Sequence, residues 1–208
     1  MKIIFDLDGT LFSSGNVAIK AFRKVFEKLD LEAPPNKKLL STLGYPIGEI
    51  WEFLIPEDKE KRVLAKTLME EIENEMIKEG QGQLFSDVLD TLKALKSQGH
   101  TLMILSNCDK PYLDVISKRF KFEKYFAGLY CAGMFDKLTK SEILKQLLSG
   151  DKNAVMVGDR FHDVQAGIDN DIKTIWCNYG YSDEILDADY EIHKFSKILD
   201  IIDELPRS

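Results

Sequence analysis

Two carboxylates one residue apart, Asp6 and Asp8, follow a short apolar run at residues 3–5 that predicts a buried strand. Like charges this close repel each other and are costly to bury, so the pair favours a cation between them, and oxygen ligands suit Mg²⁺. An aspartate can also act as a nucleophile and form an aspartyl-phosphate. Gly9 lets the backbone turn closely over a small anion, and Thr10 offers that anion a hydroxyl. On these residues alone, a strand followed by an acidic turn explains the stretch equally well.

Two other apolar runs also lead into residues that could do chemistry. The run at 101–105 is followed by Ser106, and the run at 154–157 is followed two residues later by Asp159. Parallel α/β sheets bind ligands beyond the carboxyl ends of their strands. Asp6, Ser106 and Asp159 are therefore predicted to meet, although they lie far apart in the sequence. This convergence favours a functional site over an incidental acidic turn.

The elements that position these residues alternate between strand and helix. After the first strand and a long insertion, the sequence predicts helices at 85–97, 109–120, 140–148 and 161–170, strands near 101–105, 129–132, 154–157, 172–177 and 190–192, and a last helix to Leu205. Such alternation predicts an α/β fold, with a Rossmann-like parallel sheet and helices on both faces. Thr139 is predicted to cap the helix that begins at Lys140.

Residues 15–82 interrupt the alternation and are predicted to be helical throughout. An apolar stripe at helical spacing runs through the charged stretch 57–79, and the glycines within 80–82 end it. The predicted domains are an α/β core, residues 1–14 and 83–208, and an inserted helical domain, residues 15–82. An insertion attached by two linkers can act as a mobile lid over a site at the strand ends.

Composition narrows the classes of function. The chain has 208 residues, 44% of them hydrophobic, and a net charge of -7. These values favour a folded protein with a substantial core, and they disfavour binding to nucleic acid or to an acidic membrane surface. The three cysteines are isolated, so we expect no disulfide framework and a cytoplasmic location. Asp6 and Asp8 interrupt any apolar signal segment, and no run approaches membrane-spanning length.

Together, the motifs resemble those of the haloacid dehalogenase superfamily, in its phosphatase branch. The first motif of that family, DxDGT, is similar to residues 6–10, and the second, a Ser or Thr after a hydrophobic strand, is similar to Ser106. The third, a lysine that opens a helix, is similar to Lys140, and the fourth, GDxxxD, is similar to residues 158–163. Four motifs in this order and spacing are strongly specific. The helical insertion between the first two resembles the family's C1-type cap.

The resemblance implies a role for each acid. Asp6 would attack phosphorus and become phosphorylated, and Asp8 would protonate the leaving oxygen and then activate water. Mg²⁺ would lie between the Asp6 carboxylate, the Asp8 backbone carbonyl and Asp159. Asp163, one helical turn beyond Asp159, would hold the metal directly or through water.

The same resemblance implies the groups that bind the phosphate. Ser106 and the backbone of Asn107 would donate hydrogen bonds to phosphate oxygens, and Lys140 would neutralise the phosphate and the nucleophile together. Lys137, three residues earlier, is an alternative for that lysine. Tyr45 lies in a Gly-Tyr-Pro turn that resembles the cap loop reaching toward the substrate, so it is a candidate for specificity.

The predicted function is that of a Mg²⁺-dependent phosphomonoesterase that acts on a small phosphorylated metabolite, resembling phosphoglycolate phosphatases. A phosphomutase of the β-phosphoglucomutase type shares the cap and the two acids, although Thr10 favours hydrolysis. A third hypothesis is a non-catalytic binding protein on the same fold, which the intact acidic cluster disfavours. Neither the substrate nor the oligomeric state is readable from the sequence.

Overall fold

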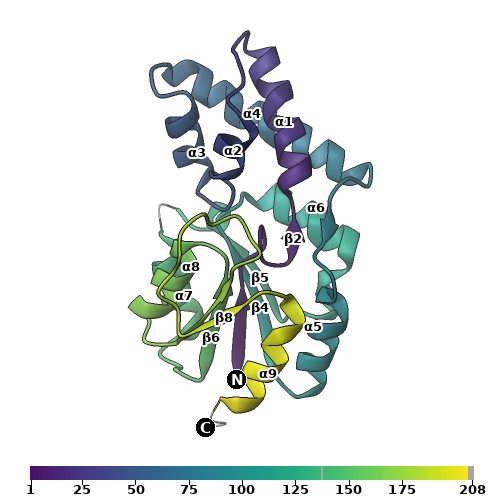
Figure 1. Ribbon diagram of the computed structural model, residues 1–208, viewed down its shortest axis with the longest axis vertical. Coiled ribbons are helices and arrows are strands. Elements are labelled where there is room, and N and C mark those ends of the chain that lie inside the picture. Colours follow the sequence, from purple (N-terminus) through teal and green to yellow (C-terminus); the bar gives the residue numbers. More distant parts are fainter. Residues whose placement is uncertain (137, 206–208) are drawn as a thin grey trace.

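A computed structural model describes residues 1–136 and 138–205 of the protein. Within them, six parallel strands form one sheet in the order β5-β4-β1-β6-β7-β8 (Figure 1). The strands are β1 (Lys2–Phe5), β4 (Thr101–Ser106), β5 (Gly128–Cys131), β6 (Ala154–Gly158), β7 (Lys173–Cys177) and β8 (Tyr190–Ile192). β1 pairs with β4 on one side and with β6 on the other, so the strands that lead into Asp6, Ser106 and Asp159 are neighbours. The predicted α/β class is confirmed.

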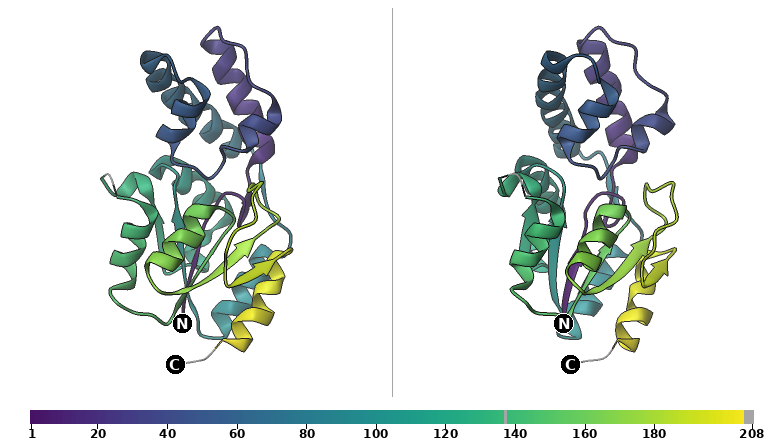
Figure 2. Two further views of the ribbon diagram at one scale, coloured as in Figure 1. Left: turned by 60° about the vertical axis from the view of Figure 1, so that its left-hand side comes forward. Right: turned by 90° about the vertical axis from the view of Figure 1, so that its left-hand side faces the viewer.

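Helices cover both faces of this sheet, as Figure 2 shows. They are α5 (Val88–Ser97), α6 (Lys110–Phe120), α7 (Lys140–Leu148), α8 (Phe161–Asp169) and α9 (Ile198–Glu204). Alternate residues of β1 point to opposite faces. Ile3 and Phe5 therefore join one apolar cluster, whereas Ile4 joins a second cluster with Ile143 and Leu144 of α7. All five side chains are fully buried, as expected for a parallel strand covered on both faces.

A block of four helices lies beyond one end of the sheet, at the top of Figure 1. Its helices are α1 (Gly15–Lys28), α2 (Asn36–Leu40), α3 (Ile47–Leu54) and α4 (Lys59–Lys78). Trp51 packs at the centre of the block, with its ring centroid 5.5 Å from that of Phe22 and 6.1 Å from that of Phe26. No helix in the described part of the chain is both long enough and apolar enough to cross a membrane.

The two segments that join the helical block to the sheet pair with each other, where the sequence predicts only linkers. β2 (Phe12–Ser13) and β3 (Gln83–Leu84) form a short antiparallel ribbon. Strands of two residues are too short to show a periodic pattern, so nothing in the sequence signals them. Gly82 precedes β3 with a φ of +76°, and a Cβ there would overlap the ring of Phe12.

Arg119 on α6 fixes the second of these segments. Its guanidinium donates hydrogen bonds to four backbone carbonyls, those of Ile77 (3.4 Å), Gly80 (2.6 Å), Gln81 and Gly82 (2.8 Å). Three of these carbonyls belong to the turn that follows α4, so one side chain supplies donors to the chain where the helix ends. The helical block is thus attached to the core by hydrogen bonds as well as by the chain.

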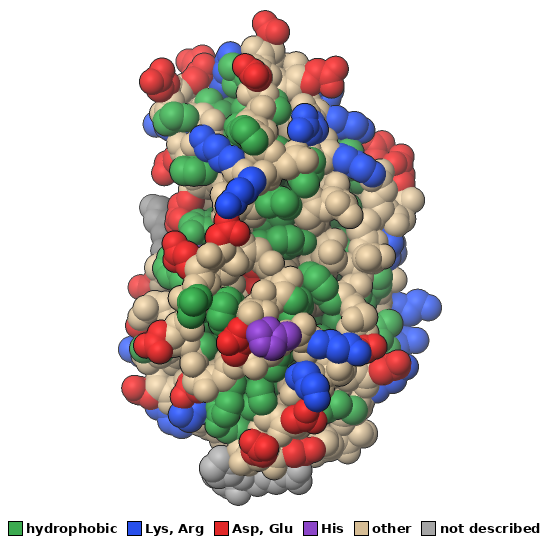
Figure 3. Space-filling model, viewed as in Figure 1, with side chains coloured by type: hydrophobic (Ala, Val, Ile, Leu, Met, Phe, Trp, Pro, Cys, Tyr) green, Lys and Arg blue, Asp and Glu red, His purple; other side chains and the backbone are tan. Residues whose placement is uncertain are grey.

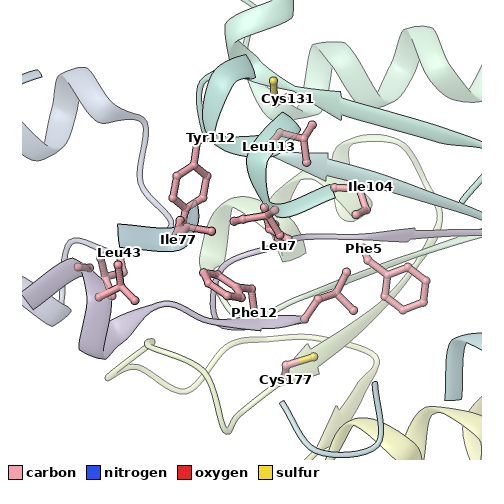
Figure 4. Packing of buried hydrophobic residues seen from close by; sticks show 14 of the residues in the cluster. Phe5, Leu7, Phe12, Leu43, Ile77, Ile104, Tyr112, Leu113, Cys131 and Cys177 are labelled. Atoms are coloured by element: carbon pink, nitrogen blue, oxygen red, sulfur yellow. The ribbon is translucent and has the colours of Figure 1, made fainter. Parts of the chain in front are cut away.

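Apolar packing also runs without a break from the sheet into the helical block. Figure 4 shows Ile104 on the sheet, Leu7 and Phe12 near the ribbon, and Leu43 and Ile77 on the side of the helical block, all within one cluster. Removing apolar area from water is the main favourable contribution to folding. The block therefore rests on the core through shared packing in addition to the ribbon.

Replacing Arg119 by alanine is expected to lower the free energy of unfolding by about 1–3 kcal/mol, because several carbonyls lose a charge-assisted donor. Chemical denaturation measures the loss, and limited proteolysis should cut faster within residues 80–82. The matched control is Arg23→Ala, which removes one exposed hydrogen bond, from Arg23 Nη2 to Asn36 Oδ1 at 2.8 Å. Equal losses in the two variants would contradict the role of Arg119.

Candidate active site

Three carboxylates and one ammonium group lie together at the carboxyl ends of β1 and β6. Asp6 follows β1, Asp159 follows β6, and Asp163 lies in the first turn of α8. One carboxylate oxygen of each lies within 4.8 Å of those of the others, and all three side chains are buried. The Nζ of Lys140, the first residue of α7, lies 2.7 Å from Asp6 Oδ1 and 2.6 Å from Asp163 Oδ1. The structure thus brings four motif residues into one buried acidic cluster.

Local sequence sets the position of Lys140. The hydroxyl of Thr139 accepts a hydrogen bond from the backbone N–H of Glu142, whose carboxylate accepts one from the backbone N–H of Thr139. This reciprocal capping box fixes the start of α7 and so directs its first side chain. The predicted cap at Thr139 is confirmed. Lys137, the alternative lysine, lies outside the described residues.

The acidic cluster has too little positive charge to balance its carboxylates. When ionised, its three acids and one lysine leave two net negative charges in a buried space. Burial raises the pKa of Asp6, an effect that Lys140 opposes, and burial together with Asp163 raises the pKa of Asp159 to about 7. Burial alone would lower the pKa of Lys140, but the charges of Asp163 and Asp6 outweigh it and raise that pKa.

One oxygen of the cluster has no hydrogen-bond donor among the described residues. Asp6 Oδ2 is buried and unpaired, whereas both oxygens of Asp163 are engaged, Oδ1 by Lys140 and Oδ2 by the backbone N–H of Arg160 at 2.9 Å. A buried carboxylate oxygen without a partner is costly. Hard oxygen ligands around a deficit of two positive charges suit a divalent cation, so the residues present fit a bound Mg²⁺.

Gly9 and Thr10 hold Asp159 from the loop after β1. Gly9 has a φ of +81°, and a Cβ there would overlap the Asp159 carboxylate, so only glycine suits both the turn and the close approach. The Thr10 hydroxyl lies 3.5 Å from Asp159 Oδ1, and the backbone N–H of Tyr181 donates to Asp159 Oδ2 at 2.7 Å. Contact of Gly9 and Thr10 with a bound anion stays a prediction.

Asp8 lies toward the helical block, and its side chain contacts a residue that no motif contains. Asp8 Oδ1 accepts a hydrogen bond of 2.7 Å from the hydroxyl of Tyr112 on α6. Burial raises the pKa of Asp8, and the Tyr112 hydrogen bond opposes that rise. A carboxyl group with a raised pKa suits proton transfer near neutral pH. Tyr112 lies 104 residues from Asp8, so only the tertiary structure shows the pairing.

Ser106 and Asn107, at the end of β4, are buried beside a cavity between the helical block and the strand ends. Ser106 Oγ accepts a hydrogen bond from the backbone N–H of Cys108 at 3.3 Å. Asn107 Nδ2 donates to the carbonyl of Gly44 at 2.9 Å, so its side chain contacts the helical block. A phosphate contact through the Asn107 backbone stays a prediction.

The cavity has a volume of about 80 Å³. One water needs roughly 10–15 Å³ by the same measure, so the cavity has room for a group of several heavy atoms. Asp8, Ser106 and Asn107 line it from the core, and Tyr45 lines it from the helical block. Tyr45 therefore borders the space that a ligand next to the acidic cluster would enter.

Arg160, just before α8, fastens the helical block to the core. Its guanidinium donates hydrogen bonds to the carbonyls of Leu43, at 2.6 Å, and Ser41 in the helical block, and to the carbonyl of Tyr181, at 3.0 Å, in the core. The guanidinium carbon also lies 4.9 Å from the ring centroid of Tyr45, a cation–π contact. The fourth motif contains this arginine, but its contacts with the helical block follow only from the fold.

Comparison with known proteins places these features in a family. The profile of the family described as haloacid dehalogenase-like hydrolase matches residues 3–177. A 5'-nucleotidase from Pseudomonas aeruginosa is 24% identical over 200 residues, covering 88% of this chain and 85% of the relative. A phosphoglycolate phosphatase from Aquifex aeolicus is 26% identical over 186 residues, covering 86% of this chain and 85% of the relative.

A solved structure, that of a predicted phosphatase from Clostridium acetobutylicum, has a TM-score of 0.87 at 22% identity and covers 98% of both chains. This likeness shows the fold, while the family profile spans all four motifs. The prediction of a phosphatase enzyme is confirmed at the level of the enzyme class. The different names of the two relatives leave the substrate open. With its four motifs on this fold, the chain belongs to the haloacid dehalogenase-like hydrolase family.

Proposed function

We propose that the protein is a Mg²⁺-dependent phosphomonoesterase that hydrolyses a small phosphorylated metabolite through an aspartyl-phosphate on Asp6. The buried acidic cluster carries this proposal. Asp6 has one oxygen without a hydrogen-bond donor among the described residues, while Lys140 holds the other at 2.7 Å. The names of the two relatives, a nucleotidase and a phosphatase, support the same class of reaction.

In the first step, a carboxylate oxygen of Asp6 forms a bond to phosphorus while the bond from phosphorus to the leaving oxygen breaks. Asp8 gives its proton to that oxygen, and its raised pKa favours the protonated form that this step needs. In the second step, water attacks phosphorus, Asp8 takes the proton of that water, and the bond from phosphorus to Asp6 breaks. The products are the free alcohol and inorganic phosphate, and both acids return to their starting states.

The phosphate would be held by groups that converge on Asp6. The ammonium of Lys140 would reduce the repulsion between the phosphate and the attacking carboxylate. The hydroxyl of Ser106, the backbone N–H of Asn107 and the loop at residues 9–10 would donate hydrogen bonds to its oxygens. Donors fixed in place before the reaction stabilise the charge that spreads over the transferred group.

The acidic cluster would hold Mg²⁺ through the Asp6 carboxylate, the Asp8 backbone carbonyl and Asp159. When bound, the ion would supply the positive charge that the cluster lacks and offset the charge of the phosphate. Asp163 would hold the ion either directly or through a water molecule. Since Lys140 and Arg160 already engage both of its oxygens, we favour the indirect role, in which Asp163 positions Lys140.

We assign residues 15–82 to a cap domain and residues 1–14 and 83–208 to the core domain. The ribbon of β2 and β3 would be the hinge, and closure over the cavity would exclude water and macromolecules such as nucleic acids. The small volume of the cavity supports a small substrate. All three cysteines are free, which supports the expected cytoplasmic location.

Asp6→Asn tests the proposed function. The amide cannot act as the nucleophile, so release of phosphate from p-nitrophenyl phosphate should fall by about 10³-fold or more, and removal of Mg²⁺ by EDTA should abolish it in the wild type. Asp151→Asn, an exposed change outside the site, is the matched control, and circular dichroism checks the fold. Activity of Asp6→Asn within tenfold of wild type would overturn the covalent mechanism. Interconversion of sugar-phosphate isomers without net phosphate release would favour the mutase instead.

Arg160→Ala is expected to raise KM about tenfold with a smaller effect on kcat. The change removes the side-chain hydrogen bonds to the cap and the contact with Tyr45, so the closed position of the cap loses stability while the acidic cluster keeps its backbone contacts. Steady-state kinetics with p-nitrophenyl phosphate measure both constants. Arg23→Ala, a change at an exposed residue of α1, should leave both constants unchanged. A fall in kcat alone would show that Arg160 acts on the chemistry rather than on closure.

Tyr112→Phe should move the alkaline limb of the pH profile of kcat/KM to higher pH. The hydrogen bond from Tyr112 favours the ionised form of Asp8 and lowers its pKa, so its loss raises that pKa. Because Asp8 must be protonated to act as the acid, the active form then persists to higher pH. Tyr125→Phe, which removes a hydroxyl without a hydrogen bond among the described residues, is the control. A shift to lower pH would contradict the assignment of Asp8 as the acid.

A further inference from the structure

The cavity between cap and core is the space for the alcohol part of the substrate, if Asp6 attacks the phosphate as proposed above. Asp8, the proposed proton donor to the leaving oxygen, lines this cavity from the core. Helix α4 lines it from the cap with Lys66, Met69, Glu70 and Glu73. Residues three and four apart share one face of a helix, so these four form a single stripe toward the cavity. Side chains of α4 would therefore contact the leaving group.

The polar part of this wall is acidic. The carboxylates of Asp8, Glu70, Glu73 and Asp109 line the cavity, and among the described lining residues Lys66 is the single cation. Lys66 Nζ lies 3.1 Å from Asp109 Oδ2, so its charge already has a partner. Figure 3 shows acidic and basic side chains mixed over the face in view, whereas acids predominate among the charged residues that line the cavity. A leaving group that enters the cavity meets three carboxylates without a paired cation.

Among the described residues, Glu73 has no hydrogen-bond or ion-pair partner in the wall of the cavity. Its carboxyl group forms no hydrogen bond or ion pair with any described residue. Burial and the charge of Asp8 raise its pKa to about 8, so an ammonium group beside Glu73 would favour its ionised form. Neighbours on the wall such as Met69, Ile50 and Phe22 offer no donor. An unpaired carboxyl group on the wall of a cavity is the arrangement that a ligand with hydrogen-bond donors would complete.

We propose that Glu73 selects the leaving group by accepting hydrogen bonds from hydroxyl or ammonium donors, while a second anionic group finds no unpaired cation among the described lining residues. The substrates are then phosphomonoesters of short polyols or amino alcohols, and esters that carry a carboxylate or a second phosphate are disfavoured. This inference rests on the proposed function and narrows its substrate class. It also disfavours 2-phosphoglycolate, the substrate of the phosphatases that this sequence resembles, because the glycolate part carries a carboxylate into the cavity.

Three esters with the same two-carbon skeleton test the proposal. They are O-phosphoethanolamine, with a cationic end, 2-hydroxyethyl phosphate, with a neutral end, and 2-phosphoglycolate, with an anionic end. For the wild type with Mg²⁺, kcat/KM for each of the first two should exceed that for 2-phosphoglycolate by at least tenfold. Glu73→Lys should lower kcat/KM for O-phosphoethanolamine at least tenfold and raise it for 2-phosphoglycolate. Glu73→Gln should lose the preference for the cation, so that in this variant kcat/KM for O-phosphoethanolamine no longer exceeds that for 2-hydroxyethyl phosphate.

Two further variants make the test specific. Glu75→Lys makes the same charge change on the exposed side of α4, two residues away, and should leave all three ratios unchanged. Lys66→Gln examines the opposite reading, in which Lys66 leaves Asp109 to bind an anion. A selective loss of 2-phosphoglycolate hydrolysis in Lys66→Gln would overturn the role of Glu73. Circular dichroism verifies that each variant is folded.

The failure of this inference is distinguishable from the failure of the proposed function. If the wild type hydrolyses p-nitrophenyl phosphate but prefers 2-phosphoglycolate among the three esters, only the selection by Glu73 is wrong. The same holds if Glu73→Lys leaves the three ratios as they are in the wild type. If no phosphate is released from any ester in the presence of Mg²⁺, the proposed function is wrong and the inference falls with it.

Discussion

Mutual repulsion among three buried carboxylates at the ends of two neighbouring strands is the constraint on which the rest of the site depends. Lys140 offsets one charge, and backbone N–H groups of Arg160 and Tyr181 each support one carboxylate oxygen. Leaving a buried charge without its partner costs about 3–5 kcal/mol, so the cluster exists only because the surrounding fold is rigid enough to hold it. Burial of β1 between two other strands supplies that rigidity.

The same constraint explains why local sequence predicts so much of this site. Groups that must meet at a fixed distance are placed at the ends of regular elements, where the geometry is best defined. Asp6 follows the apolar residues Ile3, Ile4 and Phe5 of β1, and Lys140 follows the capping residue Thr139 at the first position of a helix. Apolar periodicity and capping signals predict such positions without knowledge of the tertiary structure. The helix at 140–148 and the strand at 190–192 have the predicted bounds.

Residues that bind partners across the junction of core and cap cannot be predicted from apolar periodicity and capping signals. Tyr112, Arg119 and Arg160 bind partners at least 21 residues away in the chain, so their roles follow only from the folded structure. The ribbon of β2 and β3 is too short for a periodic signal. The helix predicted from residue 85 begins at Val88 instead, because Asp87 adopts a left-handed conformation, with a φ of +66°, that a helix cannot include.

Under the proposed function, the chemistry and the selection of the leaving group depend on different parts of the chain, and Arg160 contacts both. The acidic cluster and Lys140 belong to the core, where repulsion leaves little freedom to vary. Glu73 and Tyr45 belong to the cap, where a change of side chain alters the wall of the cavity without moving the cluster. The backbone N–H of Arg160 donates a hydrogen bond to Asp163 of the acidic cluster, and its guanidinium donates one to the carbonyl of Leu43 in the cap. If the cap closes around a well-matched leaving group as proposed, its contacts rest against the same loop that holds the acids, and selection and catalysis would then be coupled through the position of that loop.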